Sequence, residues 1–359
     1  MKILFLAGSL EPGKDGVGDY TRALAIECAR WGHETLLVSI NDPWIITSVQ
    51  DSALLRLGTS TPWPDRAKAL QKFLRDSRPD IVSLQFVPYA FHLRGLPLAL
   101  LRILRGMMGH LPVQIMFHEI WIGAQIRAPL KFRAVGFFQR KIIKTLVKSL
   151  NCRVIHTSNL VYVHLLNRNA IGAKHLPLFG SVPVVATDDS QGVVNDNVLR
   201  LGLFGSIHPE WSPDALLTQL QKLGRPIQLA HIGRIGPGES VWMNLAKRYD
   251  SEIAIQRLGE QSLEDISRFF SSVHFGISTS PLSLIGKSSC VAAMLEHGLP
   301  VIVTRNDVHF AGISEVVLTS EQLLPLDDRF LTRITSVGRQ SPKSRRPEIA
   351  AQFLRDVGA

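Results

Sequence analysis

The sequence TSPLSLIGKSSCVAAMLEHGLPVIV fills residues 279–303, and an apolar run at residues 274–278 leads into it. Small and apolar residues follow Gly286 and Lys287 as far as Gly298. This pattern predicts a strand, a loop, a helix opened by residues 286–289, and a second strand at residues 301–303. Free N–H groups at a helix start, with a lysine beside them, form an anion site. We therefore expect a phosphate or diphosphate there, the alternative being a surface helix with a solvated lysine.

The same alternation of strand and helix extends through the rest of the chain. Strands are expected at residues 2–7, 36–39, 54–57, 79–85, 113–117 and 153–156, and then at 199–204, 228–232, 253–256, 275–278, 301–303 and 316–318. Helices are expected at residues 19–31, 67–76, 94–108, 130–150, 160–167, 240–248, 262–272 and 348–357, and one begins at Pro213. Because two such series follow one another, an α/β chain with two doubly wound parallel-sheet domains is predicted.

A change of composition separates the two series. Residues 177–197 contain prolines, glycines and a pair of aspartates, and a basic segment with prolines follows at residues 339–346. Such segments are typical of linkers. The first domain is therefore expected at residues 1–180, a linker at 181–197, the second domain at 198–338, and a basic linker with a C-terminal helix at 339–359.

The amino-acid composition indicates which classes of partner and which cellular compartment are expected. The chain has 359 residues, of which 45% are hydrophobic, and a formal net charge of +10. That charge favours anionic partners such as nucleotides or phospholipid headgroups, although it can also serve solubility alone. The three cysteines are odd in number and far apart, which fits a reducing compartment and neither disulfides nor a metal site. We recognise no signal peptide and no membrane-spanning stretch, so a cytoplasmic protein is expected.

The ends of the predicted strands supply the candidate site residues, because ligands of doubly wound sheets bind beyond the carboxyl ends of the strands. His118 and Glu119 follow the strand at residues 113–117. A neutral imidazole there could donate a hydrogen bond to a sugar hydroxyl, with a nearby carboxylate fixing its tautomer. The alternative is a histidine whose ring is satisfied by backbone groups. His208 is a weaker candidate because it lies in a loop, and no spacing among the histidines predicts a metal site.

Two familiar nucleotide-binding motifs are excluded by their spacing. A Walker A loop needs a glycine five residues before Gly286, and position 281 is proline. Gly16 and Gly18 are followed at the third place by Thr21, and the glycines at 233, 236 and 238 are wrongly spaced for a dinucleotide fingerprint. These glycines can still allow a ligand or another backbone segment to approach closely.

The order of short motifs along the chain resembles a known family. The motifs are Gly16-Val-Gly-Asp-Tyr-Thr, Arg30-Trp-Gly-His, Pro79-Asp, His118-Glu, Thr157-Ser-Asn, Gly205, Arg257-Leu-Gly and Gly298-Leu-Pro-Val. In this order they resemble the two-domain GT-B glycosyltransferases, most nearly glycosyltransferase family 4, over residues 1 to about 305. Each motif is weak alone, and their order makes the fold assignment specific.

The resemblance implies a hexosyltransferase that moves a sugar from a nucleotide-sugar to a glycan or lipid-linked acceptor, as in polysaccharide biosynthesis, with retention at the anomeric carbon. It further implies no metal and no cofactor, because the nucleotide-sugar is a substrate. His118, with Glu119 beside it, would contact the donor sugar in a cleft between an acceptor-side first domain and a donor-binding second domain. The donor would be bound by Gly205, Ser206, His208, Gly233, Arg234, Leu258, Ser280, Gly286, Lys287, Ser288 and Ser289, and the phosphates and acceptor would lie near Gly16, Val17 and Gly18.

The sequence departs from the family at its usual pair of glutamates. Counted back from Gly298, the two positions of the Glu-x7-Glu pair hold Ile285 and Ala293. Glu296 is present but three residues late, on a helix that is expected to direct it elsewhere.

A second departure removes two positive charges. The family usually has an arginine and a lysine in the loop that Gly205 opens, and the matching places hold Ser206 and Trp211. Either Lys287 and Arg234 bind the diphosphate instead, or the donor is unusual, or transfer activity has been lost. The alternatives to a transferase are therefore a GT-B protein that binds a nucleotide or glycan without transfer, a nucleotide-sugar epimerase on the same fold, and a non-enzymatic scaffold at a membrane surface.

Two basic helices bear on the membrane. The predicted helices at residues 94–108 and 130–150 interleave lysines and arginines with large apolar residues. Such helices could lie on an anionic membrane surface, in which case the protein would be peripheral on the inner face. The alternative is a pair of amphipathic helices with a solvated basic face. There is no helix-turn-helix, zinc-finger or RNA-binding signature, so nucleic acid is not an expected partner.

Overall fold

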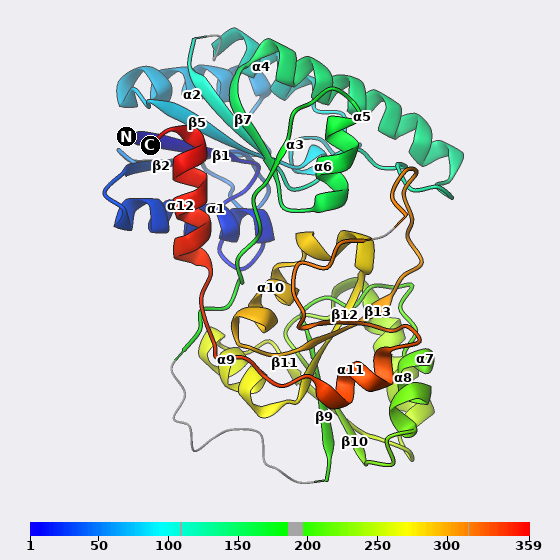
Figure 1. Cartoon of the computed structure of the whole chain (residues 1–359). Coiled ribbons are helices and arrows are strands. Elements are labelled where there is room, and N and C mark those ends of the chain that lie inside the picture. The colour runs from blue at the N-terminus through cyan, green and yellow to red at the C-terminus, as the bar shows by residue number, and fades with distance from the viewer. Residues whose placement is uncertain (108–109, 186–196, 315) are drawn as a thin grey trace. The chain divides into compact units, whose positions relative to one another are not determined.

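The computed structural model describes residues 1–107, 110–185, 197–314 and 316–359, and it divides into two compact units (Figure 1). The first unit comprises Met1–Pro177 together with Arg346–Ala359, and the second comprises Leu178–Arg345. Each unit is built around its own parallel sheet, which confirms the predicted α/β class with two parallel-sheet domains. Most of the linker expected at residues 181–197 lies outside the described residues.

The first unit contains an eight-stranded sheet whose neighbouring strands are parallel except for the pair β3–β4. In spatial order the strands are β3 (Val49–Gln50), β4 (Leu54–Gly58), β2 (Glu34–Asp42), β1 (Lys2–Ala7), β5 (Ile81–Phe86), β6 (Pro112–Phe117), β7 (Asn151–Thr157) and β8 (Lys174–His175). The helices are α1 (Gly16–Arg30), α2 (Trp63–Ser77), α3 (Pro88–Phe91), α4 (Leu98–Met107), α5 (Leu130–Ser149), α6 (Leu160–Asn167) and α12 (Arg346–Val357).

The second unit contains a six-stranded, fully parallel sheet. In spatial order its strands are β11 (Ala254–Gly259), β10 (Ile227–Ile232), β9 (Leu199–Phe204), β12 (Phe275–Pro281), β13 (Val301–Arg305) and β14 (Leu323–Pro325). Its α-helices are α7 (Asp214–Gln221), α8 (Glu239–Tyr249), α9 (Leu263–Ser272), α10 (Ser289–Glu296) and α11 (Phe330–Ser336), with 3-10 helices η2 (Gly236–Gly238) and η3 (Leu282–Lys287).

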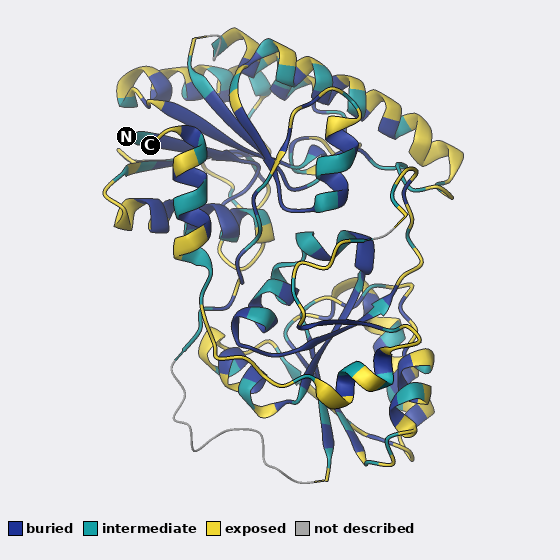
Figure 2. Ribbon diagram, viewed as in Figure 1, coloured by how far each residue is buried: buried dark blue, intermediate teal, exposed yellow. Residues whose placement is uncertain are grey.

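The burial of the strands explains why they could be predicted from apolar runs in the sequence. Every residue of β5 is buried, as are all but the first residue of β1, because helices cover both faces of a parallel sheet (Figure 2). One expected strand is wrong, however. Residues 316–318 form no strand, and β14 completes the sheet instead. Val317 is 69% exposed, whereas Leu323 and Leu324 are buried, so packing distinguishes two short apolar runs that look alike in sequence.

The strand order fixes where a ligand can bind in each unit. In the second sheet the chain runs from β9 outward to β11 and then resumes on the other side of β9 with β12. The equivalent reversal in the first sheet lies between β1 and β5. A crevice opens at the carboxyl ends of the strands where the order reverses. The loops after β9 and β12, and those after β1 and β5, are therefore the expected ligand-binding segments.

The terminal helix α12 belongs to the first unit, where it packs against α1 and β7 (Figure 1). Its apolar side is fully buried, and the ring of Phe353 lies 5.8 Å from that of Phe5 in β1. On another side the carboxylate of Asp356 accepts hydrogen bonds from Lys174 at 2.9 Å and from His156 at 3.0 Å. These contacts fix the last turn of the chain against the first sheet.

Candidate functional site

The two glycine loops of the second sheet meet each other at its carboxyl edge. Gly205 follows β9 with φ at +75°, and Gly233 follows β10 with φ at +94°. A Cβ atom on Gly233 would lie 3.4 Å from the backbone nitrogen of Gly205. A Cβ atom on Gly236 would lie 3.1 Å from Oγ of Ser206. The positive φ angles favour glycine at these positions, and at Gly236 the short distance to Ser206 favours it further.

A buried histidine in β10 forms a hydrogen bond with the loop that follows β9. Nε2 of His231, in β10, lies 2.8 Å from the carbonyl oxygen of Gly205, to which it donates a hydrogen bond. Burial lowers the pKa of His231, and its ring lies 5.5 Å from that of Trp242. Sequence reasoning assigned this histidine no role in the site. Its position, just before the glycines at 233–238, was the only signal that could have found it.

The start of α10 differs from the helix predicted at residues 286–289. Gly286 and Lys287 end the 3-10 helix η3, and α10 begins at Ser289 with Ser288 as its N-cap. Oγ of Ser288 accepts the N–H of Val291 at 3.3 Å, which is the usual role of a capping serine. Lys287 is therefore the last residue of η3, half-buried and one residue before the cap of α10.

These segments come together. A Cβ atom on Gly205 would lie 2.9 Å from Sγ of Cys290, so the loop after β9 touches the first turn of α10. The loop also contacts β12, because the N–H of His208 donates to Oγ1 of Thr279 at 3.0 Å. Thr279 adjoins the predicted residue Ser280. The geometry thus gathers the predicted residues 205, 206, 208, 233, 280 and 286–289 around the point where the strand order reverses.

Two predicted donor residues lie farther along the sheet. Arg234 and Glu260 form a two-bond ion pair, with Nη2–Oε2 at 3.0 Å and Nε–Oε1 at 3.2 Å. The carboxylate raises the pKa of Arg234, whose side chain is half exposed. Leu258 lies in β11, the edge strand, and packs against the apolar core. Arg234 therefore already has a carboxylate partner.

An arginine that sequence reasoning missed lies at the end of β13. The side chain of Arg305 is 6% exposed and its Nη2 contacts Asp307 at 2.6 Å and Glu210 at 2.9 Å. Glu210 belongs to the loop after β9, so Arg305 ties that loop to the end of β13. The positive charge of the guanidinium is thus paired with two carboxylates. Its place at a strand end, in the sequence Val301-Ile-Val-Thr-Arg-Asn-Asp, was the available signal.

The positions of the missing glutamates are apolar. Ile285 and Ala293 are buried in one hydrophobic cluster with Met294 and Leu299. Glu296, three residues late, is 3% exposed, and its Oε1 accepts the N–H of Gly180 at 2.8 Å. This carboxylate therefore binds the backbone of the segment after residue 177.

In the first unit, Gly16, Val17 and Gly18 form the start of α1. The carboxylate of Asp15 caps this helix and accepts the N–H groups of both Val17 and Gly18 at 2.8 Å. A Cβ atom on Gly18 would lie 2.7 Å from the carbonyl oxygen of Ser9, whereas one on Gly16 would meet nothing within 4 Å. Gly18 is thus required for close packing, and a carboxylate of the chain itself occupies the anion-binding start of the helix.

His118 follows β6 and is 7% exposed. Its Nε2 lies 2.8 Å from Oε1 of Gln85, in β5, and its backbone N–H donates to the carbonyl of Phe86 at 3.1 Å. The ring of Tyr20, one turn into α1, packs edge-on against the imidazole at 5.1 Å. The structure therefore brings the predicted histidine close to the helix that begins at residues 16–18.

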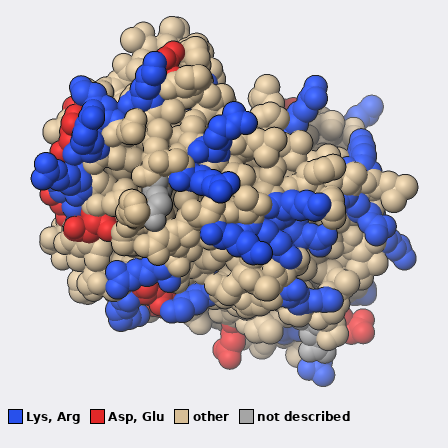
Figure 3. All heavy atoms as spheres, turned by 90° about the horizontal axis from the view of Figure 1, so that it is seen from above, with Lys and Arg blue, Asp and Glu red and all other residues tan. Residues whose placement is uncertain are grey.

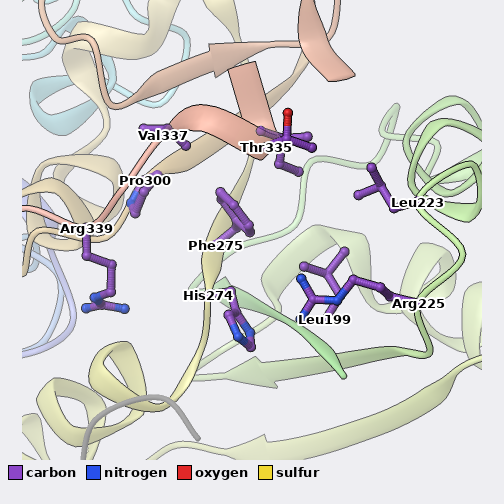
Figure 4. A pocket seen from close by; sticks show the side chains of 10 residues that line it. Leu199, Leu223, Arg225, His274, Phe275, Pro300, Thr335, Val337 and Arg339 are labelled. Carbon is purple, nitrogen blue, oxygen red and sulfur yellow. The ribbon is translucent and has the colours of Figure 1, made fainter. Parts of the chain in front are cut away.

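A pocket of about 420 Å³ lies at the opposite edge of the second sheet (Figure 4). Its lining includes Leu199 and Phe275, at the first residues of their strands, with Arg225, His274 and Arg339 around them. Arg339 donates to the carbonyls of Phe270, Val273 and His297, which end α9 and α10. None of the predicted site residues lines this pocket, so it is separate from the carboxyl-edge site.

Metal binding and thiol reactivity are the other kinds of chemistry to consider in the described part of the chain. No group of three or more histidine, cysteine or acidic residues there could hold a metal ion. Burial raises the pKa of Cys290 to about 11 and that of Cys152 to about 11, so both are thiols near neutrality. Among the described helices, none has the length and hydropathy that crossing a bilayer requires.

The sequence and the fold of the chain differ in what they resemble among known proteins. No family model and no curated protein sequence matches the chain. Solved structures do match. The Anabaena protein HepE, in complex with UDP and glucose, has a TM-score of 0.59 at 14% identity, with 99% of this chain and 95% of that chain covered.

Two further structures show how widely the fold is used. The lipopolysaccharide outer core galactosyltransferase WaaB has a TM-score of 0.55 at 14% identity, over 98% of this chain and 95% of its own. A UDP-N-acetylglucosamine 2-epimerase has a TM-score of 0.51 at 11% identity, over 99% and 94%. At these identities the similarity establishes the fold and leaves the reaction open. The chain has the GT-B fold, as its motif order predicted.

Proposed function

We propose that the chain is a retaining glycosyltransferase that moves a sugar from a nucleotide-sugar to a glycan or lipid-linked acceptor, without a metal. The observation that carries the proposal is the meeting of the Gly205 loop with the start of α10, where the strand order of the second sheet reverses. Such a position in a parallel sheet suits a nucleotide. HepE, whose structure contains UDP and glucose, shares the fold over nearly the whole chain.

In this proposal the second unit binds the donor. Lys287, Ser288 and the backbone after Gly286 would bind the diphosphate together with the Gly205–Ser206 loop. A lysine next to a helix start supplies charge where the family's loop cations are absent. The ion pair between the buried side chain of Arg305 and the exposed carboxylate of Glu210 would hold the loop after β9 in place. The departing diphosphate would assist deprotonation of the acceptor, so the chain would supply chiefly positioning and charge stabilisation.

In the first unit His118 would contact the donor sugar, with Glu119 next to it, and the loop at residues 16–18 would lie near the acceptor. The proposal for His118 is supported by its place at a strand end and by its fixed ring. Because Asp15 already accepts the N–H groups of Val17 and Gly18, this loop is suited to packing against a neutral acceptor better than to binding a phosphate.

A second candidate is a protein of this fold that binds the nucleotide-sugar without transferring it. The observation that favours it is the replacement of both family glutamates by buried apolar residues, Ile285 and Ala293. An epimerase is the remaining enzymatic alternative, since a 2-epimerase shares the fold.

Titration calorimetry with UDP- and GDP-sugars tests the proposal first. Binding of any one supports a donor site, and binding of none would refute the transferase and the epimerase together. Lys287→Ala should weaken the affinity about tenfold or more, because a charge-assisted phosphate contact is worth about 1.5–3 kcal/mol. The matched control is Lys247→Ala, an exposed lysine on α8.

Products then separate the candidates. A transferase releases the nucleoside diphosphate when a membrane extract supplies the acceptor, and it does so in the presence of a chelator. An epimerase converts the sugar of the nucleotide-sugar alone, which NMR of the sugar protons detects. Binding with neither product would favour the binding protein.

We further propose a cytoplasmic protein that associates with an anionic membrane through α4 and α5. Residues 93–148 contain ten lysines and arginines and one acidic residue, Glu119. Figure 3, which looks onto the top of the first unit as drawn in Figure 1, shows Lys and Arg gathered on this face. Each such charge near an anionic surface contributes about 1 kcal/mol.

Exposed apolar residues accompany the charges on α5. Leu130 is 79% exposed, and three phenylalanines of the same helix are between 39% and 55% exposed. Nζ of Lys141 lies 4.6 Å from the centre of the Phe137 ring. Aromatic side chains set among lysines are typical of helices that lie in a membrane interface. This arrangement supports the membrane reading over an ordinary solvated face.

A further inference from the structure

Hydrogen bonds join the terminal helix to His118 through the interior of the first unit. The participating side chains are Asp356, His156, Gln114, Ser83, Gln85 and His118, in that order. His156 and Gln114 are fully buried, as is Ser83, and Gln85 is 1% exposed. A carboxylate in the last turn of α12 is thus connected without a gap to His118, which follows β6.

The direction of the first two bonds follows from the chemistry of Asp356. An ionised carboxylate only accepts, so Nε2 of His156, 3.0 Å away, must carry a proton. Asp356 is ionised: burial acts to raise its pKa, but hydrogen bonds from Lys174 and His156 outweigh that and lower it. Burial also lowers the pKa of His156, which favours the neutral ring. Nδ1 of a neutral His156 then accepts, so Gln114 must present its amide N–H at 3.2 Å.

The remaining bonds are then determined in turn. With its NH₂ group directed at His156, Gln114 offers its oxygen to the hydroxyl of Ser83 at 2.5 Å. Ser83 has donated its only proton, so its oxygen accepts from Nε2 of Gln85 at 2.7 Å. The oxygen of Gln85 is left for His118, whose Nε2 lies 2.8 Å away and must donate. Every bond therefore points from His118 toward Asp356.

We infer that Asp356 is a positioning residue that sets the tautomer and the ring orientation of His118 through this one-way chain of hydrogen bonds. Nε2 of His118 then carries a proton, and in the neutral form of the ring this leaves Nδ1 as the acceptor. Under this inference the proton on Nε2 is donated to Gln85, whereas the sequence led us to expect that the imidazole donates to a sugar hydroxyl. A chain with one polarity has no second arrangement of similar energy while the carboxylate is in place.

Nitrogen NMR of the histidine side chains tests the inference, because it distinguishes a protonated from an unprotonated ring nitrogen. Signals of His118 are assigned by their loss in His118→Ala. Wild type should show a proton on Nε2 and none on Nδ1 at neutral pH. Asp356→Asn keeps an acceptor and should preserve this tautomer. Asp356→Ala removes the acceptor and should give a mixture of the two tautomers.

Two further variants separate polarity from packing. Gln352→Ala alters the same helix, where Gln352 donates to the carbonyl of His175 at 2.8 Å, but it leaves the chain intact and should preserve the tautomer. Ser83→Ala interrupts the chain without touching α12 and should mix the tautomers as Asp356→Ala does. A proton on Nδ1 in wild type, or an unchanged tautomer in both Asp356→Ala and Ser83→Ala, would overturn the inference.

The catalytic consequence rests on the proposed transferase function. Asp356→Ala should lower kcat about tenfold, which is the factor expected when one hydrogen bond is lost in the transition state. The affinity for the donor should change little. Asp356→Asn should restore the rate. A wild-type protein that neither binds nor turns over a nucleotide-sugar would refute the proposed function and leave the tautomer result standing. An unchanged kcat in an Asp356→Ala variant with mixed tautomers would show that the tautomer of His118 does not govern turnover.

Discussion

Gly205 lies against Cys290, so closely that a Cβ atom on the glycine would be 2.9 Å from the cysteine sulfur. This contact joins the loop after β9 to the first turn of α10, the two segments assigned to the donor diphosphate. The distance is shorter than real Cβ contacts allow, and φ at +75° adds strain for any residue with a side chain. A substitution at Gly205 therefore requires the side chain of Cys290, or the loop itself, to shift.

We predict that Gly205→Ala lowers stability by more than the ~1–2 kcal/mol that a left-handed alanine costs. The matched control is Gly224→Ala, where φ is +64° and a Cβ atom would meet nothing within 4 Å. Urea unfolding of both variants isolates the contact with Cys290. Adding Cys290→Ala should recover part of the loss. Equal losses at the two glycines would mean that the contact contributes nothing.

Glu296 gives the next prediction, because its buried carboxylate accepts the N–H of Gly180 at 2.8 Å. Glu296→Ala leaves that buried N–H without its acceptor and should cost about 1.5–3 kcal/mol of unfolding free energy. Glu296→Gln keeps an oxygen there and should cost less. Affinity for a nucleotide-sugar should be unchanged in the glutamine variant. A loss of affinity without loss of stability would instead place Glu296 in the donor site.

The contacts of Glu296 and Asp356 are examples of structure that could not be predicted from the sequence. Strands and helices were predictable because a buried parallel strand is a short apolar run and each helix has an apolar side. The alternation of predicted strands and helices was sufficient to predict two parallel sheets. Contacts between distant residues leave no such pattern: His156 and Asp356 are 200 positions apart, and neither stands in a motif. The sequence assigned His156 no role in the site and predicted residues 339–359 as a basic linker with a C-terminal helix.

The same limit applies to the candidate site. His118 and the glycines could be found because they end strands, where a turn forces glycine and a ligand favours a polar side chain. Arg305 also ends a strand, but its partner Glu210 lies 95 positions earlier. Its contact with the loop after β9 therefore could not be predicted from the sequence. The type of helix before Ser288 was equally hidden, because Gly286 and Lys287 suit the start of an α-helix and the end of a 3-10 helix alike.

Buried histidines make stability depend on pH, and His297 offers the cleanest test. Burial lowers its pKa, and its Nδ1 donates to the carbonyl of Ala293 at 2.7 Å. The folded chain therefore binds fewer protons than the unfolded chain as the pH falls below the usual value near 6.5. Unfolding free energy should decrease as the pH falls through that region, by at most about 1.4 kcal/mol per pH unit for this one group.

The measurement compares urea unfolding of wild type and His297→Gln at about pH 7.5 and about pH 5.5. The glutamine variant should be less stable at both values, because the ring packs 4.9 Å from that of Phe270. Its loss of stability on acidification should nevertheless be smaller. An identical pH dependence in both proteins would mean that His297 takes up no proton on unfolding.

The last prediction concerns the basic face of the first unit. Flotation with vesicles should recover the protein when the lipid is anionic and lose it when the lipid is zwitterionic, and salt should weaken the anionic binding. Lys141→Glu with Lys144→Glu reverses two charges on α5 and should abolish recovery. Phe137→Ser with Phe138→Ser removes apolar surface that is 43% and 55% exposed, and should weaken binding without changing its dependence on salt. The matched control is Lys222→Glu with Lys247→Glu, which makes the same change of net charge on the second unit. Equal loss in the control and in the α5 variant would show that net charge alone drives the binding, and α5 would then be an ordinary solvated helix.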